Sequence, residues 1–284
     1  MAMAPIALFT HNRPEHTRRT VEALARNEHA DQSTLFIFSD GPNSAEDTAK
    51  VGAVRSYLGS ITGFRSVEIV HRPRNLGLAE SIIRGVTDVC RQDGRVIVIE
   101  DDLITSPFFL RYMNEALDLY ENTSEVISIH GYAYPIRERL PETFFIKGAD
   151  CWGWATWQRG WELFDADGSS LLAQLESRGL TGQFDFDGTY PFTAMLRDQI
   201  AGNNNSWAIR WYASAFLRDR LTLFPGRSLV SNIGNDPSGT HCTNTARYDV
   251  TLTAQPTKVD KLAPRENVQA RAAFERYFRQ LHSK

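Results

Sequence analysis

The sequence predicts an α/β fold with a mostly parallel central sheet and helices on both faces. Short apolar runs alternate with amphipathic stretches through the first 130 residues, the pattern of a parallel sheet wrapped by helices. One of these runs, residues 96–99, is β-branched and apolar throughout, as expected of a strand buried on both faces. With 284 residues, 42% of them hydrophobic, the chain can bury a sizeable core as one domain.

Elements of the first half follow from this alternation. Pro14 marks the first turn of a helix, where its missing N–H costs nothing, and Asp40-Gly41-Pro42 is a turn that closes a strand. We expect strands at residues 6–9, 35–38, 67–70, 96–99 and 126–129, and helices at residues 13–26, 45–58, 79–90 and 107–121. Ligands of such sheets bind beyond the carboxyl ends of the strands, where polar segments follow at residues 10–13, 39–42, 72–78 and 100–102.

The alternation fades beyond residue 132. We expect helices at residues 171–180, 207–218 and 265–282, and a polar loop at residues 198–205. Residues 225–242 are rich in Gly, Ser, Asn and Pro and predict a long loop, of a length that is usually functional or disordered.

Charge and composition exclude several classes of partner. A net charge of −3 provides no basic field for nucleic acid or an anionic membrane, and no run of roughly twenty apolar residues predicts a transmembrane helix. Cys90, Cys151 and Cys242 lack CxxC spacing, which favours a reducing compartment without structural zinc. No secretion signal is visible, so we expect a cytoplasmic protein that acts on any membrane-linked material from outside the bilayer, as a peripheral protein.

The acidic triplet Glu100-Asp101-Asp102 ends the buried strand and is the strongest chemical signal. Three adjacent carboxylates repel one another unless a cation or hydrogen-bond donors hold them. Mg²⁺ or Mn²⁺ uses one or two carboxylates together with substrate phosphates, so a nucleotide diphosphate is the simplest complement. The alternative is that Asp102, shortly before Thr105, only caps the next helix.

Other nucleotide and hydrolase motifs are missing from the sequence. The first strand is followed by Thr10-His11-Asn12-Arg13-Pro14 instead of GxGxxG, and neither a P-loop, a serine nucleophile elbow nor HExxH occurs.

Three segments resemble the nucleotide-sugar domain of GT-A glycosyltransferases. They are residues 5–42, residues 74–81 (Arg-Asn-Leu-Gly-Leu-Ala-Glu-Ser) and residues 98–109, which contain Glu-Asp-Asp and Pro-Phe-Phe. The sequence most resembles N-acetylglucosaminyltransferase I and its bacterial relatives within the inverting family 2, densely to about residue 130 and sparsely beyond. The resemblance implies a single GT-A domain over residues 1–284. Its nucleotide-sugar half would be residues 1–130, and its acceptor half residues 131–284, with a closing loop at 225–242 and a C-terminal helix.

Carried over to this chain, the resemblance implies roles for the strand-end residues. Asp102 would bind the metal, Mn²⁺ or Mg²⁺, while Glu100 and Asp101 would face the sugar and ribose of the donor. Asp40 would hydrogen-bond the base with Arg13 nearby, although Asp40 also suits a turn residue that holds Gly41-Pro42.

The remaining donor-binding candidates lie in loops. Thr10 and Asn12 belong to the first strand-end wall, and Asn75 and Gly77 would shape a loop against the donor or form a plain turn. His241 would contact the diphosphate or complete the metal shell, or is only a surface residue.

Four tryptophans between residues 151 and 161 have two interpretations. Trp154, Trp157 and Trp161 share a helical face and suit a core, an interpretation that we favour for Trp157 and Trp161. Trp152 and Trp154 flank Gly153, where the chain can approach a sugar closely, so we assign Trp152 to the acceptor and Trp154 to the donor. Trp207 is a further acceptor-binding candidate.

The general base is where the sequence departs from the family. An aspartate follows the matching tryptophan in the resembling enzymes, but Ala208 follows Trp207 here. We rank Asp198 first as the base, ahead of the alternatives Asp185, Asp187 and Asp236.

These observations predict a metal-dependent, inverting glycosyltransferase. It would move a hexose or N-acetylhexosamine from a nucleotide-diphosphate donor, commonly a UDP-sugar, to a glycan or lipid-linked acceptor in surface polysaccharide or glycoconjugate synthesis. Two alternatives remain: a non-catalytic nucleotide-sugar-binding module, and a sugar-phosphate nucleotidyltransferase, which normally has a glycine-rich basic loop after the first strand.

Overall fold

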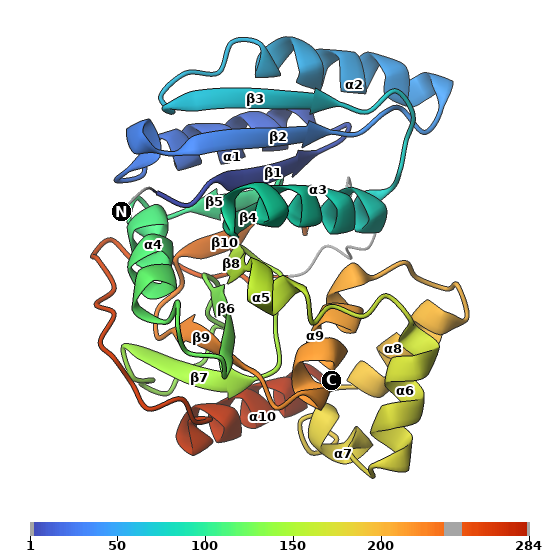
Figure 1. Cartoon of the computed structure of the whole chain (residues 1–284), viewed down its shortest axis with the longest axis vertical. Helices are drawn as coiled ribbons and strands as arrows, with labels where there is room; N and C mark the ends of the chain where they lie inside the picture. The colour runs from blue at the N-terminus through green and yellow to red at the C-terminus, as the bar shows by residue number, and fades with distance from the viewer. Residues whose placement is uncertain (1–2, 236–245, 283–284) are drawn as a thin grey trace.

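A computed structural model describes residues 3–235 and 246–282. Its main feature is one eight-stranded mixed sheet in the order β3-β2-β1-β4-β8-β6-β9-β7 (Figure 1). The strands are β1 (Ile6–Thr10), β2 (Thr34–Ser39), β3 (Ser66–His71), β4 (Arg95–Glu100), β6 (Val126–His130), β7 (Thr143–Lys147), β8 (Trp154–Trp157) and β9 (Leu221–Pro225). A separate two-stranded sheet pairs β5 (Leu103–Thr105) with β10 (Val230–Asn232) in antiparallel fashion.

Strand directions decide which residues share an edge of the sheet. Strands β3, β2, β1 and β4 are parallel, whereas β8 is antiparallel both to β4 and to β6. Strand β6 therefore points the same way as β4, and β9 is parallel to β6. The carboxyl ends of six strands thus lie along one edge, and the predicted α/β class with a mainly parallel sheet is confirmed.

Helices cover both faces of the sheet because successive strand residues point to opposite sides. In β1, Ile6 and Leu8 join the cluster formed with α1 (Pro14–Ala25), α2 (Ala45–Leu58) and α4 (Phe109–Leu119). Ala7 and Phe9 join the opposite cluster, with α3 (Leu78–Asp93) and α9 (Trp207–Leu217). The strand ends are therefore held between two packed layers.

A third core supports the far end of the sheet. It lies between strands β7 and β9 and the helices of the lower part of Figure 1: α6 (Gly168–Ser177), α7 (Thr181–Phe184), α8 (Phe192–Ile200) and α10 (Val268–His282). A single turn, α5 (Gln158–Trp161), follows β8.

Three local expectations were wrong. Trp154 begins strand β8 rather than a helix, helix α8 extends through Asp198 to Ile200, and the expected loop at 225–242 contains strand β10. The period of three between Trp154 and Trp157 fits a helix, but in the strand it places the two indoles in opposite core clusters.

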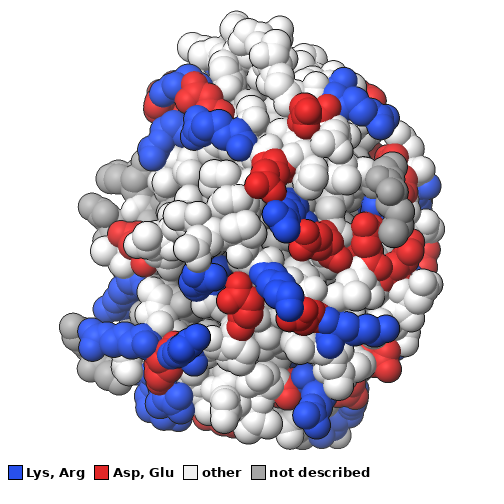
Figure 2. Space-filling model, turned by 90° about the vertical axis from the view of Figure 1, so that its left-hand side faces the viewer, with Lys and Arg blue, Asp and Glu red and all other residues white. Residues whose placement is uncertain are grey.

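The surface has no single-sign field on the face that Figure 2 shows. Lys and Arg are interspersed there with Asp and Glu, in keeping with the small net charge. Within residues 3–235 and 246–282, no helix combines the length and apolar character needed to cross a bilayer.

Candidate active site

The acidic triplet lies where β4 ends, beside the end of β1. Phe9 of β1 is in register with Glu100, so the turn after Thr10 runs next to the triplet. Arg13, at the start of α1, donates from Nη1 to Oδ2 of Asp102 at 2.9 Å, and the two side chains are 15% and 16% exposed. The sequence thus brings a guanidinium from one strand end onto a carboxylate from the next.

Burial makes the triplet electrostatically costly. It raises the pKa of Glu100 well above its usual range, and the charges of Asp102 and Asp101 add to the effect. Burial, followed by the charge of Asp102, raises the pKa of Asp101 to about 7, while Arg13 opposes both shifts. A further cation at this place would stabilise the ionised triplet.

The segment after β10 covers Asp102. The backbone N–H of Ile233 donates to the Asp102 carbonyl at 2.8 Å, and Nη2 of Arg13 donates to the Gly234 carbonyl at 3.4 Å. A Cβ on Gly234 would lie 2.0 Å from Oδ2 of Asp102, so this close approach needs glycine. The beginning of the expected closing loop therefore contacts the predicted metal ligand.

Asp40 has the role of a loop anchor. Its carboxylate accepts N–H from Gly41 (2.9 Å), Leu76 (2.9 and 3.1 Å) and Gly77 (3.0 Å), and the residue is 4% exposed. This is the turn role that the sequence left open, extended to a second loop. Asp40 positions the walls of the site from inside.

The neighbouring wall is formed by Asn75. Its Nδ2 donates to the Gly41 carbonyl at 2.9 Å and lies 3.1 Å from Nε2 of His11. A Cβ on Gly41 would lie 2.4 Å from the Arg74 carbonyl carbon, so the two loops touch through backbone.

Among the described residues, the side chains of Thr10 and Asn12 form no hydrogen bond with the triplet. Thr10 is 4% exposed, and its hydroxyl has no partner among the described residues. Nδ2 of Asn12 donates to Asp47 at 2.8 Å, which fixes the β1–α1 turn to α2.

The described residues of this site could supply only part of the ligand shell of a divalent cation. No group of three or more His, Cys, Asp or Glu side chains arranged for a metal occurs among the described residues. Asp102 uses Oδ2 for Arg13, and within the same residues Oδ1 accepts no hydrogen bond. A cation held by Asp102 would therefore depend on oxygen atoms of a phosphate ligand, as Mg²⁺ and Mn²⁺ sites commonly do.

The tryptophans divide differently from our sequence assignment. Trp154 is 0% exposed and Trp207 is 3% exposed, and their rings stack 5.4 Å apart in the core beside Trp161 and Trp211. Both are core residues that have no open face for a sugar, which corrects their assignment to donor and acceptor. Trp152 is half-buried and lies edge-on to Tyr132 at 4.8 Å.

The carboxylates proposed as the base have structural contacts. Asp198 is exposed at the end of α8, where Oδ1 accepts Nδ2 of Asn203 at 3.1 Å. Asp185 caps the start of α8 by accepting the Thr193 N–H at 2.6 Å, and Asp187 is 4.0 Å from Arg271. Asp236 and His241 lie outside the described residues.

Sequence reasoning missed a second polar group at this edge. Asp150, four residues before β8, accepts the hydroxyl hydrogen of Tyr134 on Oδ2 at 3.0 Å and lies 3.6 Å from Nε2 of His130. A lone Asp between Ala149 and Cys151 has no local pattern, so only the sheet topology could have identified it.

Comparison with known proteins identifies no family. No family model and no curated protein matches the chain. Solved structures match at low identity. The mannosyltransferase PcManGT of Pyrobaculum calidifontis, in complex with GDP-Man and Mn²⁺, is 11% identical with a TM-score of 0.41 over 75% of this chain and 68% of that one.

Two further matches are weaker. S. aureus TarS 1–349 is 9% identical, with a TM-score of 0.34 over 62% of this chain and 49% of that one. A UDP-glucose pyrophosphorylase complexed with UDP-glucose is 15% identical, with a TM-score of 0.34 over 57% and 79%. At these scores the likeness carries no argument about function.

Proposed function

We propose that this chain is a divalent-metal-dependent glycosyltransferase that moves a sugar from a nucleotide-diphosphate donor to a hydroxyl acceptor with inversion. The observation that carries the proposal is the acidic triplet at the end of β4, in which Asp101 is buried and Asp102 pairs with the Arg13 guanidinium from the end of β1. Several carboxylates at the carboxyl end of a strand suit an anionic ligand that binds together with a cation.

The residues divide the work at the donor. Asp102 would hold Mn²⁺ or Mg²⁺ through its available oxygen, and the bound cation would supply charge neutralisation for the leaving diphosphate. Arg13 lies within reach of the same anion, Glu100 and Asp101 face the sugar and ribose, and Asp40 fixes both flanking loops. A UDP-hexose or UDP-N-acetylhexosamine is the proposed donor, and a glycan or lipid-linked hydroxyl the proposed acceptor, in polysaccharide or glycoconjugate synthesis.

The same proposal treats residues 1–284 as a single GT-A domain, since one sheet continues from the donor half into the acceptor half. A nucleotidyltransferase is less well supported because the turn after β1 contains no glycine and directs Arg13 to Asp102. A binding module without turnover is separated from an enzyme by the assays below.

Metal-dependent nucleotide binding tests the donor site. We expect UDP to bind in the presence of Mn²⁺ and to lose about tenfold or more in affinity when EDTA is added or when Asp102 becomes Ala, because a charge-assisted contact of about 1.5–3 kcal/mol is removed. Isothermal titration calorimetry measures both effects. Asp88→Ala, on the exposed side of α3, is the matched control. Equal affinity of all variants without metal would refute the assignment.

Turnover is tested with a panel of UDP-glucose, UDP-galactose, UDP-N-acetylglucosamine and GDP-mannose. With a UDP-sugar we expect slow, Mn²⁺-dependent hydrolysis, which transfers the sugar to water and releases UDP. Metal-dependent binding with no release from any member would favour the non-catalytic binding module.

A further inference from the structure

A second polar group lies along the same edge of the sheet as the triplet. Asp150 precedes β8, one strand away from β4, and His130 ends β6, two strands away. In β8, Trp154 pairs with Val98 of β4 on one side and with His130 of β6 on the other. Because β8 is antiparallel to both, the residues before Trp154 extend past the carboxyl ends of β4 and β6. Asp150, four residues before Trp154, therefore lies beyond the same edge of the sheet as Glu100.

Contacts beyond the strands keep this edge in place. The Gly131 N–H donates to the Gly153 carbonyl at 2.7 Å, which extends the β6–β8 pairing by one residue. Burial raises the pKa of the Cys151 thiol, and the nearby charges of Asp150, Glu100 and Asp102 raise it further. The same thiol therefore interacts electrostatically with both Asp150 and the triplet.

Asp150 is held in a defined orientation. Oδ1 accepts the backbone N–H of Cys151 at 2.8 Å and Oδ2 accepts the Tyr134 hydroxyl at 3.0 Å, while the side chain stays 24% exposed. Among the described residues, no Lys or Arg forms an ion pair with it. The carboxylate is thus oriented by neutral donors and keeps a solvent-facing side.

His130 lies behind this carboxylate. It is 0% exposed, and neither ring nitrogen has a hydrogen-bond partner among the described residues. Burial lowers the pKa of His130 below its usual range, and the nearby Asp150 only partly opposes this shift. A buried imidazole without a hydrogen-bond partner, 3.6 Å from a carboxylate, is unusual.

Aromatic rings flank the carboxylate. Tyr132 and Trp152 lie edge-on at 4.8 Å, and Tyr248 approaches Trp152 at 5.6 Å. Tyr132 is only 1% exposed and supports the cluster from the core, whereas Trp152 and Tyr248 are half-buried, and half-buried aromatic rings suit the apolar faces of a sugar. Asp198, Asp185 and Asp187 have no comparable setting, because each accepts from or pairs with groups of its own helix end or of α10.

We propose that Asp150 is the general base of the transfer and that Trp152 lines the acceptor's approach; this inference rests on the proposed function. Asp150 takes the proton of the acceptor hydroxyl as its oxygen bonds to the anomeric carbon. The bond from that carbon to the donor phosphate oxygen breaks, and the nucleoside diphosphate leaves with the electron pair. Tyr134 is a positioning residue that orients Oδ2.

The test measures UDP release from a UDP-sugar in Mn²⁺, with water or with azide as the nucleophile. Asp150→Ala should slow release to water about a hundredfold, the usual contribution of a general base, and leave UDP affinity within about threefold of wild type. Azide is already anionic and needs no base, so it should restore release by Asp150→Ala at least about tenfold. Asp150→Asn keeps the shape of the side chain and should show the same loss.

Asp88→Ala, on the exposed side of α3, is the control and should release UDP at the wild-type rate, while Asp198→Ala tests the rival base. Normal release to water by Asp150→Ala and Asp150→Asn, with UDP still bound, would overturn the assignment and leave the proposed function standing. Loss of UDP release in Asp198→Ala, with normal release in Asp150→Ala, would also overturn the assignment of Asp150 and leave the proposed function standing. If the wild-type protein binds UDP through Mn²⁺ but hydrolyses no donor, the proposed function fails first and the role of Asp150 falls with it.

Discussion

At the scale of single residues, Asp40 joins two loops that are far apart in sequence. Its carboxylate receives three backbone N–H groups, from Gly41, Leu76 and Gly77, in a setting where the residue is 4% exposed. Such groups are costly when they are left without an acceptor in the interior. The geometry of these two loops therefore depends on one buried side chain.

Removing this acceptor should destabilise the fold. Asp40→Ala is expected to lower the free energy of unfolding by about 2–4 kcal/mol, because each unpaired buried amide costs about 1–3 kcal/mol and water can reach some of them. Asp40→Asn retains one carbonyl oxygen and should lose less. Urea denaturation measures both, with the exposed Asp88→Ala as a control within about 0.5 kcal/mol of wild type. A loss below about 1 kcal/mol for Asp40→Ala would show that other contacts hold the loops.

At the scale of elements, the start of β8 depends on backbone that only glycine tolerates. Gly153 has φ +67°, and a Cβ there would lie 2.7 Å from a methyl carbon of Val230 in β10. Gly131, at the end of β6, faces the same methyl at 2.9 Å. These two glycines let the ends of β6, β8 and β10 meet.

Two glycine substitutions should change the free energy of unfolding in opposite directions. Gly153→Ala is expected to destabilise the protein by about 2–4 kcal/mol, since a left-handed conformation costs about 1–2 kcal/mol and the clash adds to it. Gly52→Ala, inside α2 with nothing within 4 Å of its Cβ, should stabilise by about 0.5–1 kcal/mol. Thermal unfolding of both variants is the measurement. Equal effects would contradict the packing described at Val230.

The sequence predicted the first half of the fold well, but in the second half it predicted helices α6, α9 and α10 and missed strands β7, β8 and β9. Residues 45–58 were expected as a helix and form α2 with the same bounds, because apolar spacing and turn residues agree there. Strand β8 was missed, because tryptophans at 154, 157 and 161 match a helical period. The triplet could be found because its residues are adjacent. Asp150 and His130 could not, since only the insertion of β8 between β4 and β6 brings them to the edge.

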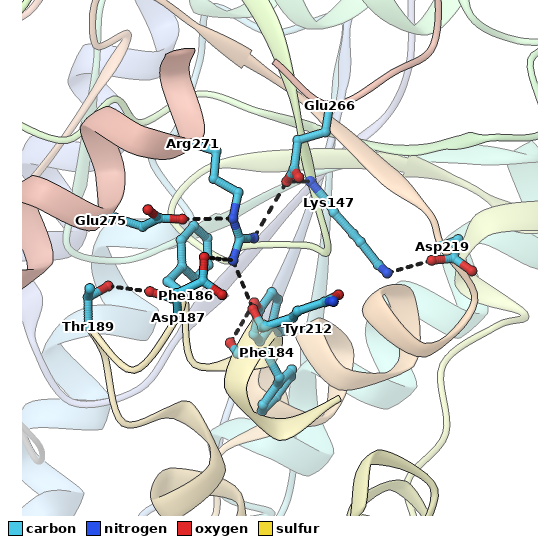
Figure 3. A network of polar contacts seen from close by, with 11 residues as sticks. Lys147, Phe184, Phe186, Asp187, Thr189, Tyr212, Asp219, Glu266, Arg271 and Glu275 are labelled. Atoms are coloured by element: carbon cyan, nitrogen blue, oxygen red, sulfur yellow. Dashed lines mark hydrogen bonds and ion pairs between the residues drawn. The ribbon is translucent and has the colours of Figure 1, made fainter. Parts of the chain in front are cut away.

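At the scale of the whole molecule, Arg271 ties the C-terminal helix to the turn after α7 (Figure 3). It lies 3.0 Å from Glu275, 3.6 Å from Glu266 and 4.0 Å from Asp187, and its guanidinium stacks 4.4 Å above Phe186. Phe186 and Asp187 have φ of 50° and 54°, a conformation that non-glycine residues rarely adopt. The network holds a strained turn against α10.

Loss of this arginine should loosen the far end of the sheet. Arg271→Ala is expected to cost about 1–3 kcal/mol of unfolding free energy, because three carboxylates lose a cation whose side chain is only 13% exposed. Arg276→Ala, in the same helix, breaks an ion pair whose partners are 49% and 47% exposed and should cost less than about 1 kcal/mol. Chemical denaturation of both compares them. Identical costs would mean that the network contributes no more than a surface pair.

The place of β8 also bears on how the chain is synthesised. Strands β4 and β6 leave the ribosome before the strand that separates them, so the edge of β4 has no partner until Trp154–Trp157 emerges. That edge belongs to an apolar strand, and unpaired apolar edges promote association between chains. The first four strands can assemble early as a unit, but nascent chains that stall before residue 154 expose a template for aggregation. Chaperone binding during that interval would protect the half of the molecule that contains the acidic triplet.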